Sequence, residues 1–154
     1  MKTFAQLVNE QLDSVQEVFP WDVEERLEKG EAPMLLDIRE ESEFNAMRIE
    51  GSLNVPRGIL ESACEYDYEE TVRELVEARD REIVIICRSG NRSVLAAVTM
   101  QIMGYQQVAS LKTGLRGWND YELQLVDAEG NAVPLDQADE YFTTHLRPDQ
   151  MSPR

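Results

Sequence analysis

The chain has 154 residues, 42% of them hydrophobic, and its 30 acidic side chains against 15 Lys and Arg give a formal net charge of -15. This length suffices for one sizeable core but is short for two domains, and the negative charge repels nucleic acid and anionic membrane surfaces, so neither is expected as a partner. The chain shows no secretory signal and no apolar run long enough to span a membrane, so we expect a cytoplasmic protein.

The first predicted element is an amphipathic helix over residues 2–19. Five apolar residues recur there at spacings of four and three: Phe4, Val8, Leu12, Val15 and Phe19. Such a stripe must be covered, either by the flank of the same domain or by a partner or second copy. The pattern divides the chain into an N-terminal helix (1–20), a domain (21–125) and a polar C-terminal extension (126–154).

Short aliphatic stretches typical of strands follow at 34–38, 53–55, 82–87 and 107–111, and all except 53–55 have the composition of buried strands. A helix is predicted over 67–80, because Asp67 and Glu70 form a capping-box pattern. Another is predicted over 91–103, ending at Gly104. The alternation predicts an α/β fold with a mainly parallel central sheet flanked by helices on both faces.

Beyond Val126 the composition turns polar. A short helix is expected after Pro134, and a mobile end from Pro148. The chain has two cysteines without a C-x-x-C pair and one histidine, His145, in this polar region. These residues supply no structural zinc site and no disulfide framework, so neither a metal nor another cofactor is expected.

The stretch "CRSGNRS", residues 87 to 93, lies where a predicted strand ends and a predicted helix begins. In a parallel sheet, ligands bind at the carboxyl ends of strands. The N–H groups of a tight loop and the start of a helix attract anions, so a thiolate at Cys87 is favoured. Arg88 and Arg92 would then serve an anionic substrate. Gly90 permits the backbone angles of a closed loop.

The remaining loop residues are small and polar and leave room for a ligand: Ser89, Asn91 and Ser93. The alternative interpretation of the stretch is a buried cysteine at a strand end, followed by a Ser-capped helix. The clustering of two arginines, a glycine and two serines around one cysteine favours a reactive site over that alternative.

At this point the sequence resembles a family. "CRSGNRS" after "EIVII" resembles the active-site loop of rhodanese-type sulfurtransferases, and three further stretches agree: "LLDIREESEF", "RIEGSLNVP" and "MGYQQVASLKTGLRGWND". The resemblance covers roughly residues 21 to 124. Arg48 stands where many members carry histidine, and the chain has extra sequence at both ends.

The resemblance implies a rhodanese-like fold and a persulfide cycle. Cys87 would be the nucleophile that carries the persulfide, and the loop from Arg88 to Ser93 would cradle it with backbone N–H groups. Arg88 and Arg92 would draw in an anionic donor such as thiosulfate. The acceptor would be cyanide, a thiol or a protein sulfur acceptor.

Other functions remain open. Related phosphatases and arsenate reductases place five residues between cysteine and arginine, whereas four separate Cys87 from Arg92. A cysteine hydrolase would need His145 as its base, in a polar tail beyond the apparent core. A non-enzymatic module of the same fold could bind a partner, and a sulfur relay in tRNA thiolation or cofactor synthesis would share the same chemistry.

Several further residues have a structural and a functional interpretation. Asp37 and Arg39 either touch substrate or form an ion pair beneath the loop. Trp118 either lines the pocket mouth or anchors the last helix of the domain. Cys64 either resolves an oxidised Cys87 or takes no part. Two basic residues flank a Gly-rich turn and either add positive potential at the mouth or are surface charges: Lys112 and Arg116.

Overall fold

A five-stranded parallel sheet forms the centre of the chain in the computed structural model, which describes residues 1–153. The strands are β1 (Gln16–Val18), β2 (Met34–Asp37), β3 (Leu53–Asn54), β4 (Glu82–Ile86) and β5 (Gln107–Leu111). Their order in the sheet is β1-β5-β4-β2-β3. The four strands expected from the sequence are all present, and the predicted α/β class is confirmed.

The apolar runs of the central strands are explained by burial on both faces. Along β4, Ile83 and Ile85 point into one core, whereas Val84 and Ile86 point into the other. Successive side chains of a strand point to opposite faces, so a strand that is covered on both sides must be apolar throughout.

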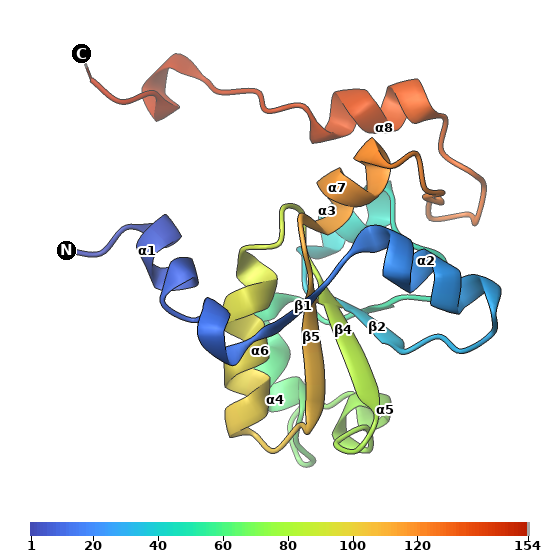
Figure 1. The fold of residues 1–154 in the computed structure, drawn as a ribbon. Coiled ribbons are helices and arrows are strands. Elements are labelled where there is room, and N and C mark those ends of the chain that lie inside the picture. Colours follow the sequence, from blue (N-terminus) through green and yellow to red (C-terminus); the bar gives the residue numbers. More distant parts are fainter. Residues whose placement is uncertain (154) are drawn as a thin grey trace.

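Helices cover both faces of the sheet. The α-helices are α1 (Phe4–Asn9), α2 (Pro20–Glu28), α3 (Glu41–Ala46), α4 (Leu60–Ala63), α5 (Arg73–Val76), α6 (Arg92–Ile102), α7 (Gly114–Asp120) and α8 (Leu135–Phe142), and three short 3₁₀ turns cover Leu12–Ser14, Arg57–Ile59 and Pro148–Gln150. Helices α1, α4, α5 and α6 supply residues to the first core, and α2, α7 and α8 to the second. Figure 1 shows α6 and α4 on one side of the sheet and α2 and α7 on the other.

The expected helix over residues 2–19 is wrong. The segment contains α1, a 3₁₀ turn and the edge strand β1. Residues Gln16–Val18 pair in parallel with β5, so their backbone groups bond to a strand far along the chain instead of within a helix. Val8 in α1 and Val15, between the 3₁₀ turn and β1, both reach the first core although no single helix joins them.

The predicted start of a helix at Asp67 is also wrong. Asp67 has a φ of +71°, a left-handed conformation that does not suit a helix N-cap. The Thr71 hydroxyl instead donates to the Glu65 carbonyl and accepts from the Tyr68 N–H, which folds the stretch into turns. Only Arg73–Val76 is helical. By contrast, α6 ends before Gly104 as predicted, and Gly104 adopts a φ of +95°.

The helix expected after Pro134 is present as α8, and it belongs to the core rather than to a loose tail. Ala138 and Phe142 are each 2% exposed and pack in the second core. The backbones of Arg48 and Val126 exchange two hydrogen bonds of 2.9 and 2.8 Å, which fasten the start of this segment. Among residues 1–153, none of the helices is long and apolar enough to cross a membrane.

The packing of α8 generates a stability prediction. We expect Phe142→Ala to lower the free energy of unfolding by about 3–5 kcal/mol, because it leaves a cavity in the second core. The control is Leu146→Ala, which truncates a side chain that is 60% exposed and should change stability by less than about 0.5 kcal/mol. Urea unfolding measures both variants. Equal, small losses would show that α8 does not contribute to the core.

Candidate active site

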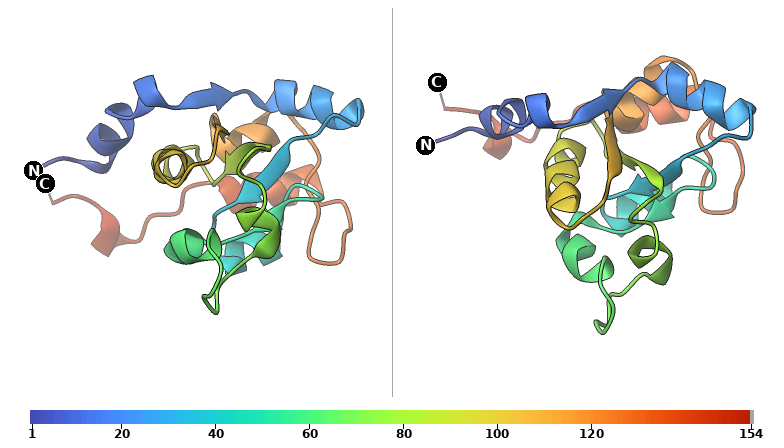
Figure 2. Two further views of the ribbon diagram at one scale, coloured as in Figure 1. Left: turned by 90° about the horizontal axis from the view of Figure 1, so that it is seen from below. Right: turned by 60° about the horizontal axis from the view of Figure 1, so that its bottom comes forward.

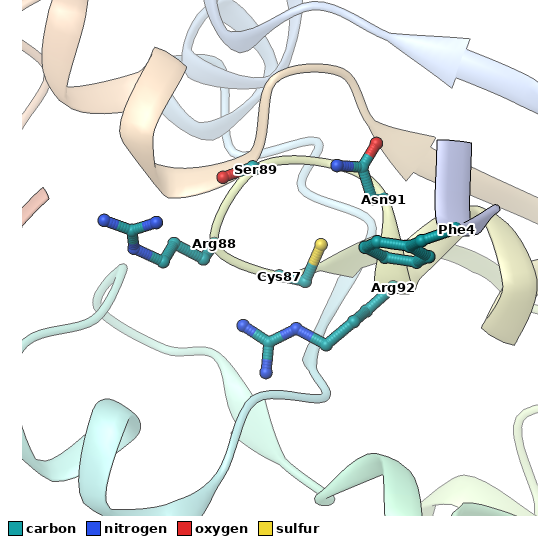
Figure 3. A pocket seen from close by; sticks show the side chains of 6 residues that line it. All are labelled: Phe4, Cys87, Arg88, Ser89, Asn91 and Arg92. Carbon is teal, nitrogen blue, oxygen red and sulfur yellow. The ribbon is translucent and has the colours of Figure 1, made fainter. Parts of the chain in front are cut away.

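The loop between β4 and α6 places Cys87 at the carboxyl end of a central strand. Its side chain is buried, with 1% exposure, and its Sγ lies inside the ring that the loop forms (Figure 3). The backbone N–H of Gly90 donates to Sγ at 3.1 Å, and that of Ser93, in the first turn of α6, at 3.4 Å. Two amide donors aimed at one sulfur stabilise a negative charge there.

Two buried serines extend this network beneath the sulfur. The Cys87 thiol donates to Ser93 Oγ at 3.3 Å, and Ser93 Oγ lies 2.7 Å from Ser110 Oγ. Hydroxyl groups rotate to suit their partners. When the sulfur is a thiolate, the Ser93 hydroxyl can donate to it while accepting from Ser110. Ser110 lies on β5, and sequence reasoning did not identify it as a site residue.

The carbonyl groups of the loop point outward, where the start of α7 binds them. Leu115 N–H donates to the Cys87 carbonyl at 3.0 Å, and Arg116 N–H to the Arg88 carbonyl at 2.9 Å. This approach requires glycine at position 114, since a Cβ there would lie 2.5 Å from the Cys87 carbonyl oxygen. Gly90 is required too, because its φ is +85° and a Cβ would lie 2.8 Å from the Thr113 nitrogen.

Arg92 is bound to a carboxylate from another part of the chain. Its two terminal nitrogens each donate to Glu43 at 3.0 Å, and Glu43 also accepts from the Glu40 N–H at the start of α3. Burial alone would raise the pKa of Glu43, but the hydrogen bonds from Arg92 and the Glu40 amide hold it below its usual value. Sequence reasoning did not identify Glu43 as a site residue.

Arg88 extends away from the sulfur toward the C-terminal segment (Figure 3). Its guanidinium donates to the carbonyl of Phe142, the last residue of α8, at 3.0 Å. The neighbouring Tyr141 also lies near the loop. Burial raises the pKa of its phenol, and the charges of four residues act on that group: Arg39, Glu43, Arg88 and Arg92. The C-terminal segment therefore borders the site.

Six residues line a cavity of about 150 Å³ above the sulfur: Phe4, Cys87, Arg88, Ser89, Asn91 and Arg92. Five of them were predicted from the loop sequence, and the two other predicted loop residues, Gly90 and Ser93, supply N–H groups to Sγ. Phe4, in α1, was not expected. Its ring lies on one side of Cys87 and Arg88 on the other (Figure 3).

A buried ion pair lies at the carboxyl end of the neighbouring strand β2. Arg39 Nη2 lies 2.8 Å from Asp37 Oδ2, and both side chains are almost completely buried. The same Nη2 donates to the Met47 carbonyl at 2.7 Å. Neither residue lines the cavity, which favours the structural interpretation of this pair.

The other candidates lie outside the cavity. Trp118 is 1% exposed and donates from Nε1 to the Gln124 carbonyl, so it anchors α7 in the core. Cys64 is buried near Tyr105 and Arg79, which precede β5 and β4 respectively and so lie at the amino end of the sheet. Burial raises the pKa of the Cys64 thiol. The remaining three are exposed at the surface: Lys112, Arg116 and His145. Within residues 1–153, no three metal-ligating side chains converge on one point.

Comparisons with known proteins identify relatives of this chain. The family model described as "Rhodanese-like domain" matches residues 20–121. A protein named "Sulfurtransferase" from Allochromatium vinosum is 30% identical over 116 residues, which cover 75% of this chain and 99% of that protein. The "Putative sulfur carrier protein YrkF" of Bacillus subtilis is 32% identical over 110 residues, covering 71% of this chain but only 54% of the relative.

One solved structure with a similar fold is a protein of unknown function from Rhodopseudomonas palustris, described as "Possible Tyrosine Phosphatase". It has a TM-score of 0.70 at 28% identity and covers 79% of this chain and 92% of its own.

The Arg92–Glu43 pair predicts a pH effect. The folded-state pKa of Glu43 lies below its ordinary value of 4.5, so the pair stabilises the fold above that value, and this contribution is lost as the pH falls through the lowered pKa. Between about pH 7 and about pH 3, the wild type should therefore lose about 1 kcal/mol more unfolding free energy than Glu43→Gln.

Denaturant unfolding at both pH values measures this difference. The control is Glu77→Gln, which removes exposed contacts with Arg73 and Tyr66; because solvent screens these contacts, the variant should depart from the wild-type pH dependence much less than Glu43→Gln does. If Glu43→Gln and the wild type lose the same stability on acidification, the pair does not anchor the loop.

Proposed function

The chain belongs to the rhodanese-like domain family, and from this premise we propose that it is a sulfurtransferase that carries sulfur as a persulfide on Cys87. The donor is thiosulfate or a related anionic sulfane compound, and the acceptor is a thiol or cyanide. The observation that carries the proposal is the position of Sγ, which faces amide donors from Gly90 and Ser93 beneath a small open cavity.

The first half of the cycle loads the cysteine. The Cys87 thiolate attacks the outer sulfur of thiosulfate, a new S–S bond forms, and sulfite leaves with the electrons of the bond that breaks. Sulfite departs as an anion, so this step needs no general acid. This suits a cavity whose lining, among residues 1–153, includes no carboxylic acid and no histidine.

The second half returns the cysteine to its starting state. A nucleophile such as cyanide or a thiolate attacks the outer sulfur of the persulfide, the S–S bond breaks, and Cys87 leaves as the thiolate. The same donors that face Sγ stabilise this leaving group: the N–H groups of Gly90 and Ser93 and the Ser93 hydroxyl.

A phosphatase is the second candidate, suggested by the description of the Rhodopseudomonas palustris structure. Two features disfavour it. The Arg92 guanidinium, which a phosphate would need, is held by both oxygens of Glu43. The lining of the cavity also provides no acid to protonate an alkoxide leaving group. A non-enzymatic binding module is disfavoured by the intact nucleophile, whereas a sulfur relay to a protein acceptor uses the same chemistry.

The central prediction concerns the two cysteines. After incubation with thiosulfate, the intact mass of the wild type should rise by one sulfur atom, and cyanide should reverse the increase. Cys87→Ser should neither gain the sulfur nor transfer it to cyanide, because a hydroxyl forms no persulfide. Cys64→Ser should behave as the wild type, since Cys64 lies away from the cavity.

Sulfur uptake by the Cys87→Ser protein would contradict the assignment. So would hydrolysis of aryl phosphates by the wild type at a rate above its sulfur transfer, if that hydrolysis disappears in Cys87→Ser.

The pairing of Arg92 with Glu43 generates a second prediction. It uses two variants that change the charge beside the cavity in opposite directions. Arg92→Ala leaves the Glu43 carboxylate uncompensated beside the cavity, and Glu43→Gln leaves the Arg92 cation uncompensated. For a dianionic donor, the KM should rise about threefold in the first variant and fall about threefold in the second at low salt. Both changes should shrink as salt is added.

Steady-state kinetics with thiosulfate and cyanide measure the two constants. Both variants lose the same bidentate contact, so a purely structural role would move the two KM values in the same direction and would contradict the electrostatic account.

A further inference from the structure

The cavity above Cys87 has one apolar wall, and that wall comes from outside the segment matched by the family model. The match begins at residue 20, whereas the wall is the ring of Phe4. The other lining side chains, apart from the cysteine, are polar or charged: Arg88, Ser89, Asn91 and Arg92. Phe4 is thus a feature of this chain's own N-terminal segment.

Phe4 is held over the cavity by the rest of α1. The Thr3 hydroxyl accepts from the Gln6 N–H, and the Gln6 side chain accepts from the Thr3 N–H, so the helix begins at a defined residue. One turn after Phe4, Val8 is 5% exposed and belongs to the first core. The helix backbone that carries Phe4 therefore has a defined place, and the Phe4 ring on it is 53% exposed.

Both arginines of the polar wall are already bound to other parts of the chain. Arg92 is bound by Glu43, and Arg88 donates to the Phe142 carbonyl. The exposed face of Phe4 has no aromatic or cationic partner among the stacked pairs of the described chain. It is the apolar surface of the cavity that an incoming group can contact.

We propose that Phe4 is a specificity-determining residue that favours sulfur acceptors whose thiol carries an apolar or aromatic group next to the sulfur. This inference rests on the proposed function. In the step concerned, the acceptor thiolate attacks the outer sulfur of the Cys87 persulfide, the acceptor becomes a persulfide, and Cys87 leaves as the thiolate. The apolar group of the acceptor lies against the Phe4 ring while this exchange takes place.

The dimensions of the cavity suit such a group. Its volume of about 150 Å³ is close to that of cavities that hold one benzene ring. An aromatic contact of favourable geometry corresponds to about a tenfold difference in rate when it is made in the transition state. With a net charge of -15, the protein offers no long-range attraction to a strongly anionic thiol.

The test separates the acceptor step from the loading step. The full-length protein is loaded with thiosulfate, its persulfide is verified by intact mass, and the donor is removed. The rate at which the Cys87 persulfide loses its outer sulfur is then measured with phenylmethanethiol and with 2-mercaptoethanol, two thiols of similar acidity. Each rate is divided by the rate of the same thiol with a low-molecular-weight persulfide, which removes intrinsic reactivity.

In the wild type, we expect the corrected rate with phenylmethanethiol to be about tenfold higher than the corrected rate with 2-mercaptoethanol. Phe4→Ala should reduce the preference to about one, and Phe4→Tyr should keep most of it. The matched control is Leu7→Ala, which truncates an exposed side chain of the same helix that does not line the cavity and should keep the full preference.

Two results would overturn this inference and leave the proposed function in place. One is a loaded wild type that shows no preference for phenylmethanethiol, and the other is a preference that survives in Phe4→Ala. Loss of the preference in Leu7→Ala as well would also overturn it, because the effect would then belong to the helix and not to the ring. A wild type that takes up no sulfur overturns the proposed function, and this inference with it, and intact mass distinguishes that result from the others.

Discussion

The site depends on the opposite directions of two sets of backbone groups in the loop that follows β4. The carbonyl groups of Cys87 and Arg88 turn outward to the first N–H groups of α7, and the N–H groups of Gly90 and Ser93 turn inward to the sulfur. An unpaired backbone carbonyl in this buried position would be costly, so the amides of α7 fix the direction of the whole loop. Trp118 in turn fixes α7 by its burial in the second core.

This arrangement explains why glycines cluster around the sulfur. The close approach of α7 leaves no space for a Cβ at Gly114, and a Cβ at Gly117 would overlap the side chain of Thr113. Gly90 closes the ring in a conformation that side-chain-bearing residues rarely adopt. The loop is thus preorganised by packing, and its amide donors need no rearrangement when charge develops on the sulfur.

The charged groups of the site have partners close by, so the site does not carry the large negative charge of the chain as a whole. An anionic substrate is therefore compatible with the acidic composition. Arg92 is paired with Glu43, and Arg88 binds a carbonyl at the end of α8, where a helix attracts a cation. Most of the net charge of -15 is on exposed side chains, whose effect decays within about 8–10 Å at physiological salt.

The two terminal segments also reach the site: α1 through Phe4 and α8 through Phe142. Both ends of the described chain extend from the same side of the molecule (Figure 2).

Short-range patterns in the sequence sufficed to predict the central strands, α6 with its stop at Gly104, and the loop that carries Cys87. These features follow from short-range rules, namely apolar runs buried on both faces, helical caps and the steric freedom of glycine. Other features are visible only in the folded chain: the edge strand β1, whose pairing partner β5 lies far along the sequence, and the contacts of the site with Glu43, Ser110, Phe4 and Phe142. Such contacts join segments that are far apart along the chain and that no periodic pattern links. Where a local signal competes with these contacts, the local signal does not decide the structure. At Asp67 the capping pattern does not start a helix, because the fold selects the conformation that satisfies both the backbone and the core.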